Sequence, residues 1–353
     1  MSDKILLVGP SWVGDMVLAI ALFRLLAQTR PGVILDVVAP GWSAPLLARV
    51  PEVRRAVPLN VGHGRLGVLS RWRLGRSLRG EGYDQAIILP RSLKSAVVPW
   101  LAEIPRRTGF LGEWRWGLLN DIRPLDQTAL PRTVDRFCAL GLPPGDSPPS
   151  SPPHPLLLAS SAGAEAARLK LDLPAPPGPL AIFCPGAEYG PAKQWPEVHF
   201  AVAARELTVR GWTVWVMGSA KEVALGETIV RLAGLGREGG GAAKTGEGAV
   251  LSLCGRTSLG EAVDLLSLAD AVVSNDSGLM HVAAALGRKV IALFGSSDPH
   301  HTPPMGPEIH ILSAGLSCSP CFKRTCPEYD EPRCLWAILP EQVVEAVLRE
   351  EDE

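Results

Sequence analysis

The sequence lacks an apolar run long enough to span a membrane. Its longest apolar stretches, such as residues 16–23, end at a charged residue well before the roughly 20 residues that a spanning helix needs. The first ten residues place an acid and a base ahead of only four apolar residues, which is not the pattern of a secretory signal. We therefore expect a soluble, cytoplasmic protein with no transmembrane segment.

The sequence also lacks short motifs that mark several kinds of nucleotide site. The turn after the first predicted strand, residues 9–15, does not contain the G-x-G-x-x-G of a dinucleotide site. Residues 239–245 lack the glycine that a Walker A loop requires before its lysine, here Lys244. The chain has no Asp-x-Asp motif, which is consistent with a site that works without a metal ion.

The length and composition of the chain indicate a globular protein of two domains. With 353 residues, the chain is too long for one ordinary core and suits two domains of about 150–180 residues each. Hydrophobic residues make up 46% and charged residues 20%, which is typical of a folded globular chain.

Positive charge is concentrated in the first half. Residues 1–160 hold 19 Lys and Arg against 12 Asp and Glu, although the net charge of the chain is −1. The excess lies between residues 65 and 123 and includes Arg71, Arg73, Arg76, Arg79, Arg91, Lys94, Arg106 and Arg107. A basic half attracts an acidic partner, which could be nucleic acid, anionic lipid or a phosphorylated glycan. A solvated arginine-rich surface explains the pattern equally well.

The order of elements predicts an α/β fold. Proline-rich segments at 143–155 and 174–179 separate the halves, because such runs sustain neither a helix nor a central strand. On both sides, short Val/Ile/Leu runs alternate with helical stretches, which predicts parallel sheets covered on both faces. We predict two Rossmann-like, doubly wound parallel-sheet domains facing a cleft: residues 1–158 and 179–338, with a linker at 159–178 and a C-terminal helix at 339–353.

The predicted strands are 5–8, 34–39, 56–59, 85–89, 180–184, 213–217, 250–254, 271–274 and 290–294. The predicted helices are 15–27, 43–49, 65–79, 95–103, 133–140, 196–210, 221–235, 258–269 and 277–286. Residues 234–248 are rich in glycine and are expected to form a surface loop. Ligands of doubly wound sheets bind beyond the carboxyl ends of the strands, so the loops after strands are the places to look for chemistry.

Asp15 is the first candidate for chemistry. It follows the first predicted strand and opens a helix. An Asp at this position is an ordinary helix N-cap, and without further context that interpretation is favoured. A carboxylate at a strand's carboxyl end can also accept a proton from a hydroxyl group.

Two loops of the second half have matching positions. Residues 185–196 form a glycine-containing loop with one lysine, Lys193, which suits a phosphate cradle or an ordinary exposed loop. Residues 274–281 follow another strand. There Asp276 or Ser277 can cap a helix, and the N–H groups of Ser277 and Gly278 can bind phosphate oxygens. His281, one turn into that helix, could face the same ligand, although a lone histidine is more often structural.

These residues together resemble a known family. Trp12-Val13-Gly14-Asp15, the loop 185–196 and Asn275-Asp276-Ser277-Gly278-x-x-His281 are similar to motifs of the lipopolysaccharide heptosyltransferases, glycosyltransferase family 9, which have the GT-B fold. The resemblance runs over nearly the whole chain in the same order. Pro185-Gly186-Ala187-Glu188 and a cysteine-rich segment look most like the heptosyltransferase II group.

The resemblance implies a role for each candidate. Asp15 would be the general base on the acceptor hydroxyl, and Lys193 would stabilise charge on the leaving ADP. The donor site would comprise Glu222 at the adenosine ribose, Thr257 beside the adenine, and Asp276, Ser277, Gly278 and His281 at the diphosphate and sugar.

The resemblance also implies the reaction and the partners. The enzyme would be an inverting transferase that moves heptose from ADP-L-glycero-D-manno-heptose onto heptosyl-Kdo2-lipid A, with no required cofactor and no nucleic acid partner. The acidic lipid A inner core would account for the basic half. The enzyme would then lie peripherally at the inner face of the cytoplasmic membrane.

Four of the seven cysteines, Cys318, Cys321, Cys326 and Cys334, form a local cluster. Four thiolates can close a tetrahedral zinc site, but the unequal spacing C-x2-C-x4-C-x7-C weakens that prediction. Reduced structural thiols are the favoured interpretation in a cytoplasm.

Two other functions remain open from the sequence. One is a different GT-B enzyme, such as a transferase or epimerase that uses a UDP-sugar. The other is a non-catalytic protein whose basic half binds an anionic glycan, lipid or RNA, in which case the Asp15 carboxylate has no role.

Overall fold

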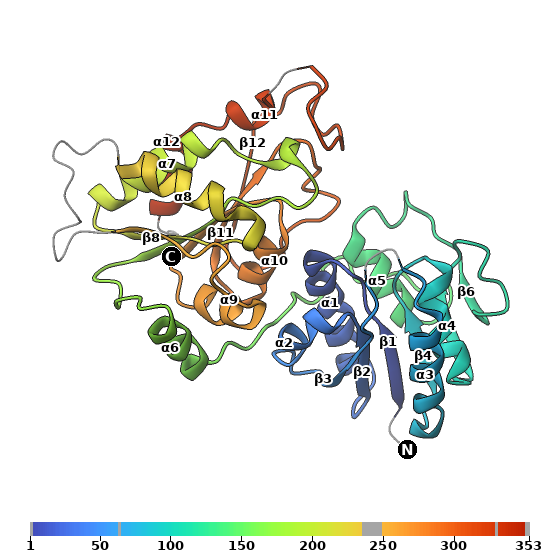
Figure 1. Ribbon diagram of the computed structural model, residues 1–353. Coiled ribbons are helices and arrows are strands. Elements are labelled where there is room, and N and C mark those ends of the chain that lie inside the picture. Colours follow the sequence, from blue (N-terminus) through green and yellow to red (C-terminus); the bar gives the residue numbers. More distant parts are fainter. Residues whose placement is uncertain (1–2, 63–64, 235–248, 329–330, 350–353) are drawn as a thin grey trace. The chain divides into compact units, whose positions relative to one another are not determined.

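The computed structural model describes residues 3–62, 65–234, 249–328 and 331–349 (Figure 1). The chain forms two compact units. The first comprises Met1–Leu158 with His300–Thr302, and the second comprises Ala159–Pro299 with Pro303–Glu353. None of the described helices is long and apolar enough to cross a bilayer. The loop expected at 234–248 lies, apart from its first residue, outside the described residues.

The first unit contains a six-stranded parallel sheet in the order β3-β2-β1-β4-β5-β6. Its strands are β1 (Lys4–Val8), β2 (Ile34–Ala39), β3 (Val53–Pro58), β4 (Gln85–Ile88), β5 (Arg106–Phe110) and β6 (Asp121–Arg123). Its helices are α1 (Val13–Thr29), α2 (Ala44–Leu47), α3 (Val68–Leu78), α4 (Leu93–Leu101) and α5 (Thr133–Gly141).

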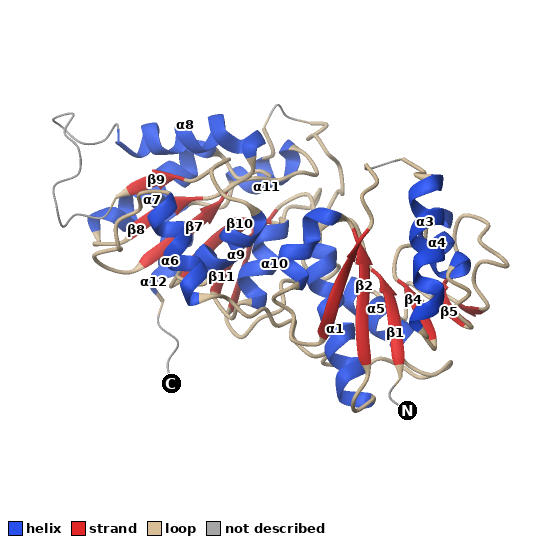
Figure 2. Cartoon of the chain, turned by 60° about the horizontal axis from the view of Figure 1, so that its bottom comes forward, coloured by secondary structure: helices blue, strands red, loops and turns tan. Residues whose placement is uncertain are grey.

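Helices cover both faces of this sheet. Leu78 of α3 and Val98 of α4 pack in one buried cluster with Leu6 and Ile88 of the strands. The chain moves from β1 to β2 in one direction and from β3 to β4 in the other. Because such crossovers are right-handed, α1 and α3 lie on opposite faces (Figure 2). Helix α5 packs against α1.

The second unit repeats the architecture with the strand order β12-β11-β10-β7-β8-β9, again all parallel. Its strands are β7 (Leu180–Cys184), β8 (Thr213–Val216), β9 (Val250–Ser252), β10 (Ala271–Asn275), β11 (Lys289–Phe294) and β12 (Ile309–Ser313). Its helices are α6 (Ser161–Lys170), α7 (Glu197–Val209), α8 (Val223–Gly234), α9 (Leu259–Leu266), α10 (Gly278–Ala285), α11 (Arg333–Trp336) and α12 (Pro340–Leu348).

The predicted pair of parallel-sheet α/β units is confirmed, but three strands were missed. Strands β5, β6 and β12 lie at or next to a sheet edge. β5 begins with two arginines, β6 has only three residues, and β12 is half-exposed along its length. None of them is the continuous buried apolar run that identified the central strands.

The predicted linker at 159–178 and the predicted C-terminal helix at 339–353 both contain a helix that packs into the second unit. Within 159–178, α6 lies on α9, where Lys170 Nζ is 2.7 Å from Glu261 Oε1 and the backbone N–H of Ser160 donates to Asp264 at 3.1 Å. In the C-terminal segment, α12 buries Val343 and Val347 in the same core as α7 and α8.

A buried carboxylate joins three segments of the first unit. Asp36 of β2 is fully buried and accepts hydrogen bonds from Arg54 and Arg55 of β3 and, at 2.5 Å, from the Tyr83 hydroxyl just before β4. Burial alone would raise the pKa of Asp36, but the hydrogen bonds from Arg54 and Tyr83 outweigh it and hold that pKa below its ordinary value.

We expect Asp36→Asn to destabilise the first unit by about 1.5–3 kcal/mol at neutral pH, because charge-assisted hydrogen bonds to a buried group are lost. The folded pKa of Asp36 is lowered, so its contribution is present above the unfolded value and disappears as pH falls through the folded value. Urea denaturation at neutral and acidic pH measures both effects.

Glu165→Gln is the control for this variant, since Glu165 pairs with Arg168 on the surface of α6. Loss of this exposed ion pair should change the free energy of unfolding little. Equal destabilisation by the two variants would contradict the role given to Asp36.

Candidate functional site

Each sheet has one place where the chain reverses its direction of winding. In the first unit this is the boundary of β1 and β4, and in the second it is the boundary of β7 and β10. The loops leaving two such strands diverge to opposite faces, which opens a crevice at the carboxyl edge of the sheet. The predicted site residues Asp15, Lys193 and Asp276 come after β1, β7 and β10, three of these four strands.

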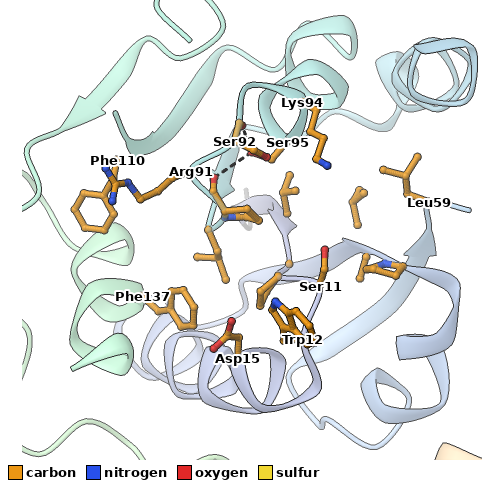
Figure 3. Close-up of a pocket in the computed structure, with 18 of the residues that line it drawn as sticks. Ser11, Trp12, Asp15, Leu59, Arg91, Ser92, Lys94, Ser95, Phe110 and Phe137 are labelled. Atoms are coloured by element: carbon orange, nitrogen blue, oxygen red, sulfur yellow. Dashed lines mark hydrogen bonds between the residues drawn. The ribbon is translucent and has the colours of Figure 1, made fainter. Parts of the chain in front are cut away.

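In the first unit, the crevice is a cavity of about 530 Å³. Its walls come from the loop after β1, the loop after β4, and the helices α3 and α5. Figure 3 shows Asp15 and Trp12 on one side, Phe137 beside Asp15, and Arg91, Ser92 and Ser95 on the opposite side. Both polar and apolar groups therefore line a space large enough for sugar residues.

The charge of this cavity is strongly one-sided. Asp15 is the single carboxylate among the described lining residues, whereas the cationic side chains are Arg65, Arg71, Arg91, Lys94 and Arg136. A cavity of this kind attracts an anionic ligand and places one potential proton acceptor within it. The sequence indicated a basic region here, but not which of its arginines line a site.

Asp15 is not the N-cap residue of its helix. The N-cap of α1 is Trp12, in extended conformation, so the interpretation of Asp15 as the N-cap is wrong. Asp15 is the third residue of the helix and half-buried. It therefore lies in the first turn of α1, where the positive end of the helix dipole attracts negative charge.

A buried arginine fixes the opposite wall. Arg115 is fully buried, and its guanidinium donates to the carbonyls of Phe110 and Pro90 and, at 3.1 Å, to the Ser95 hydroxyl. Burial, with Arg91 adding repulsion, lowers the pKa of Arg115 to about 10, so it stays charged at neutral pH. Arg115 thereby holds the loop after β4, which carries Arg91, and the start of α4, which carries Lys94. Its position in an irregular segment, between Trp114 and Trp116, has no periodicity and offered no signal in the sequence.

In the second unit, Asn275 joins the two loops of the crevice. Its amide donates to the Pro185 carbonyl at 2.7 Å and accepts from the Trp195 backbone N–H at 3.0 Å. Asn275 is fully buried at the end of β10, so the loop after β7 is fixed at both of its ends. The sequence included Asn275 in a motif but assigned it no structural role.

This arrangement brings Lys193 to Asp276. Lys193 Nζ lies 2.5 Å from Asp276 Oδ2, and both side chains are largely buried. The same ammonium lies 5.0 Å from the centre of the Tyr189 ring, which adds a cation–π contact. Two predicted residues that are far apart in the chain therefore form one charged pair.

His281 lies beside this pair. It is 4% exposed, and its Nδ1 atom finds no hydrogen-bond partner among the described residues. Burial lowers its pKa to about 4, against an opposing effect of Asp276 and with a smaller contribution from Lys193. The imidazole is therefore neutral at physiological pH.

The remaining predicted donor residues lie at the same sheet edge. Ser277 is the N-cap of α10 and makes no side-chain capping bond, and Gly278 is the first residue of the helix. Glu222 reaches the loop after β7, since a side chain on Gly186 would meet its carboxylate at 2.9 Å. It also closes a capping box with Ser219, so it has a structural role of its own. Thr257 is half-buried and precedes Ser258, the N-cap of α9.

The four clustered cysteines are all free thiols. Cys318 is exposed, Cys321 and Cys326 are half-buried, and Cys334 is buried. Across the described part of the chain, no three His, Cys, Asp or Glu side chains form a group suited to a metal ion. The sequence favoured reduced structural thiols over a zinc site for this cluster, and that interpretation stays a prediction.

Comparisons with known proteins agree on one family. The model of glycosyltransferase family 9 (heptosyltransferase) matches residues 71–330. Lipopolysaccharide heptosyltransferase 2 of Escherichia coli is 45% identical over 313 residues, which cover 88% of this chain and 87% of that protein. Lipooligosaccharide heptosyltransferase 2 of Haemophilus influenzae is 44% identical over 317 residues, 88% of each chain.

A solved structure extends the similarity to three dimensions. The ADP-heptose lipopolysaccharide heptosyltransferase II of E. coli matches with a TM-score of 0.82 and 39% identity, covering 98% of this chain and 97% of that one. The two crevices, where the chain reverses its direction of winding, thus occur in a fold shared over almost the full length of both chains. The chain belongs to glycosyltransferase family 9, the heptosyltransferases.

Proposed function

We propose that this glycosyltransferase moves heptose from ADP-L-glycero-D-manno-heptose onto heptosyl-Kdo2-lipid A with inversion at the anomeric carbon. Family membership and 45% identity to heptosyltransferase 2 support the donor and the reaction. The observation that carries the proposal is the first-unit cavity, in which one carboxylate lies among cationic side chains. It suits an acceptor that carries both phosphates and a hydroxyl group to be deprotonated.

Asp15 is the proposed base. As the acceptor hydroxyl oxygen bonds to the anomeric carbon, its proton passes to the Asp15 carboxylate, and the bond from that carbon to the ADP oxygen breaks. The cationic lining then binds acceptor phosphates without taking part in the proton transfer. Arg115 is a positioning residue, because it holds the loop that carries Arg91 and the start of α4 that carries Lys94.

Lys193 and the start of α10 are the proposed site for the departing diphosphate. Lys193 has three N–H donors, so it can keep Asp276 as a partner and still donate to a phosphate oxygen. The N–H groups at Ser277 and Gly278 add the positive end of a helix dipole. This set supplies the electrostatic stabilisation that a leaving ADP requires, and no metal ion is needed. Glu222 and Thr257 are the proposed contacts for the adenosine.

The acceptor proposed here is anchored in a lipid. The enzyme would therefore work at the inner face of the cytoplasmic membrane as a peripheral protein. The basic cavity of the first unit is the part that meets the acidic inner core.

We expect Asp15→Asn to abolish transfer while ADP binding is retained, because the amide cannot accept the hydroxyl proton at a useful rate. Transfer from ADP-heptose is measured on Kdo2-lipid A with and without the first heptose. The unaltered enzyme should act only on the heptosylated acceptor. A thermal-shift comparison of ADP-sugars with UDP-sugars tests the donor class.

Glu197→Gln is the matched control, since Glu197 is also an acid in the first turn of a helix, α7, but lies outside the cavity lining. It should keep full activity. Turnover by Asp15→Asn at the unaltered rate would disprove Asp15 as the base.

We expect Lys193→Gln to lower turnover by about 10²–10³-fold, because one donor to the developing negative charge is lost. Added Mg²⁺ should not restore activity, and a chelator should leave the unaltered enzyme unaffected. Lys170→Gln is the control, since Lys170 is an exposed lysine paired with Glu261. Inhibition of the unaltered enzyme by the chelator would contradict the metal-free site.

His281 should make the fold sensitive to acid in a defined window. Above the ordinary pKa of about 6.5 the imidazole is neutral in both folded and unfolded chains, so it has no effect. Below that pH, the imidazole binds a proton in the unfolded chain, whereas in the folded chain it binds one only near pH 4. The free energy of unfolding therefore falls as the pH is lowered. His281→Gln should lose less stability between about pH 7 and about pH 5.

The free energy of unfolding in urea at the two pH values measures this difference, with the exposed His154→Gln as control. A loss of stability in His281→Gln as large as in the unaltered protein would show that His281 is not held neutral.

A further inference from the structure

The first two turns of helix α3 have an inverted distribution of side chains. The helix buries Arg71, Gly75 and, at its end, Leu78, whereas its start exposes Val68, Leu69 and Trp72 by 69%, 56% and 44%. Leu66, just before the helix, is 63% exposed. A surface helix of a globular protein normally turns its apolar side chains inward, so this pattern requires an explanation.

The packing of α3 on α4 produces the inversion. The Arg71 guanidinium donates to the Leu66 carbonyl at 2.7 Å and to the Lys94 carbonyl at 2.9 Å, which joins the starts of the two helices. One turn later, Gly75 lies so close to Leu101 of α4 that a side chain on it would overlap that residue. From Val68 to Gly75 the inner positions of α3 are therefore occupied by Arg71 and Gly75, and Val68, Leu69 and Trp72 are left on the outer face.

The exposed apolar groups are accompanied by positive charge alone. From residue 65 to residue 79 the chain has five arginines and no Asp or Glu. Arg73 and Arg76 are exposed on α3, and the Arg76 guanidinium lies 5.2 Å from the centre of the Trp72 ring. Arg79, at the end of the helix, is paired with Glu103 of the adjoining segment. Apolar and aromatic groups interleaved with arginine suit the interface of an anionic bilayer, where rings and alkyl chains enter the headgroup layer and guanidinium groups meet phosphates.

The same segment borders the acceptor cavity. Arg65 and Arg71 line that cavity together with Asp15, while Leu69, Trp72, Arg73 and Arg76 lie outside the lining. A surface next to the cavity is where a lipid-anchored acceptor would approach.

We infer that Leu66, Val68, Leu69, Trp72, Arg73 and Arg76, here called the α3 face, dock the enzyme on an anionic lipid bilayer. This inference rests on the proposed function, because the lipid-anchored acceptor explains why docking next to the cavity is useful. The charge of the face favours a bilayer over a second copy of this chain, since two copies would bring arginines against arginines.

Two double variants test the α3 face. Leu69→Ser with Trp72→Ser removes apolar area, and Arg73→Gln with Arg76→Gln removes charge. The matched control is Leu169→Ser with Val209→Ser, which alters two similarly exposed apolar side chains, 62% and 77%, on α6 and α7 of the second unit.

Vesicle co-sedimentation measures docking without any need for activity. The unaltered enzyme and the control should bind phosphatidylcholine vesicles that contain phosphatidylglycerol, less so at high salt, and bind pure phosphatidylcholine weakly. Each α3-face variant should bind the anionic vesicles about tenfold more weakly or worse. Binding by both variants at the unaltered level, or no vesicle binding by the unaltered enzyme, overturns the inference.

Transfer assays separate this inference from the proposed function. Both α3-face variants should lose transfer onto an acceptor embedded in anionic vesicles but keep transfer onto the same acceptor after removal of its acyl chains. No transfer by the unaltered enzyme to either form would overturn the proposed function, while vesicle binding would still report on the α3 face. If light scattering without vesicles shows a dimer that the variants break, the face binds a second copy and the inference is wrong.

Discussion

The parallel arrangement of the strands determines where this protein can have chemistry. In a parallel sheet every strand delivers its carboxyl end to the same edge, so loops from distant parts of the chain meet there. Lys193 and Asp276 are more than 80 residues apart in the sequence, yet they form an ion pair because β7 and β10 are neighbours. In the first unit the neighbours β1 and β4 bring Asp15 and Arg91 into one cavity in the same way.

Buried polar side chains then fix the loops at this edge. Asn275 uses both ends of its amide to hold the loop after β7, and Arg115 uses its guanidinium to hold the loop after β4. A buried polar group stabilises a structure only when its hydrogen bonds are formed, so each of these side chains specifies one loop conformation. The irregular parts of the protein are thus defined by single residues, whereas the strands are defined by runs of apolar ones.

This difference explains what the sequence could predict. The central strands and the positions of Asp15, Lys193, Asp276 and His281 after or near them follow from the alternation of apolar runs and helices. The edge strands β5, β6 and β12 were missed because they have no continuous buried run. Arg115 was missed because its irregular segment has no periodicity that distinguishes a buried arginine from an exposed one. The basic region was recognised, but only packing shows that Arg71 points inward and Leu69 outward on the same helix.

The ion pair of Lys193 with Asp276 also bears on the release of products. An ammonium group that already has a carboxylate partner attracts a diphosphate less strongly than an isolated ammonium would, because the carboxylate repels the incoming anion. At the proposed donor site, this lowers the affinity for ADP once the sugar has left. As ADP leaves, Lys193 is again paired with Asp276 alone. A cation with a resident partner therefore favours turnover over retention of the spent nucleotide.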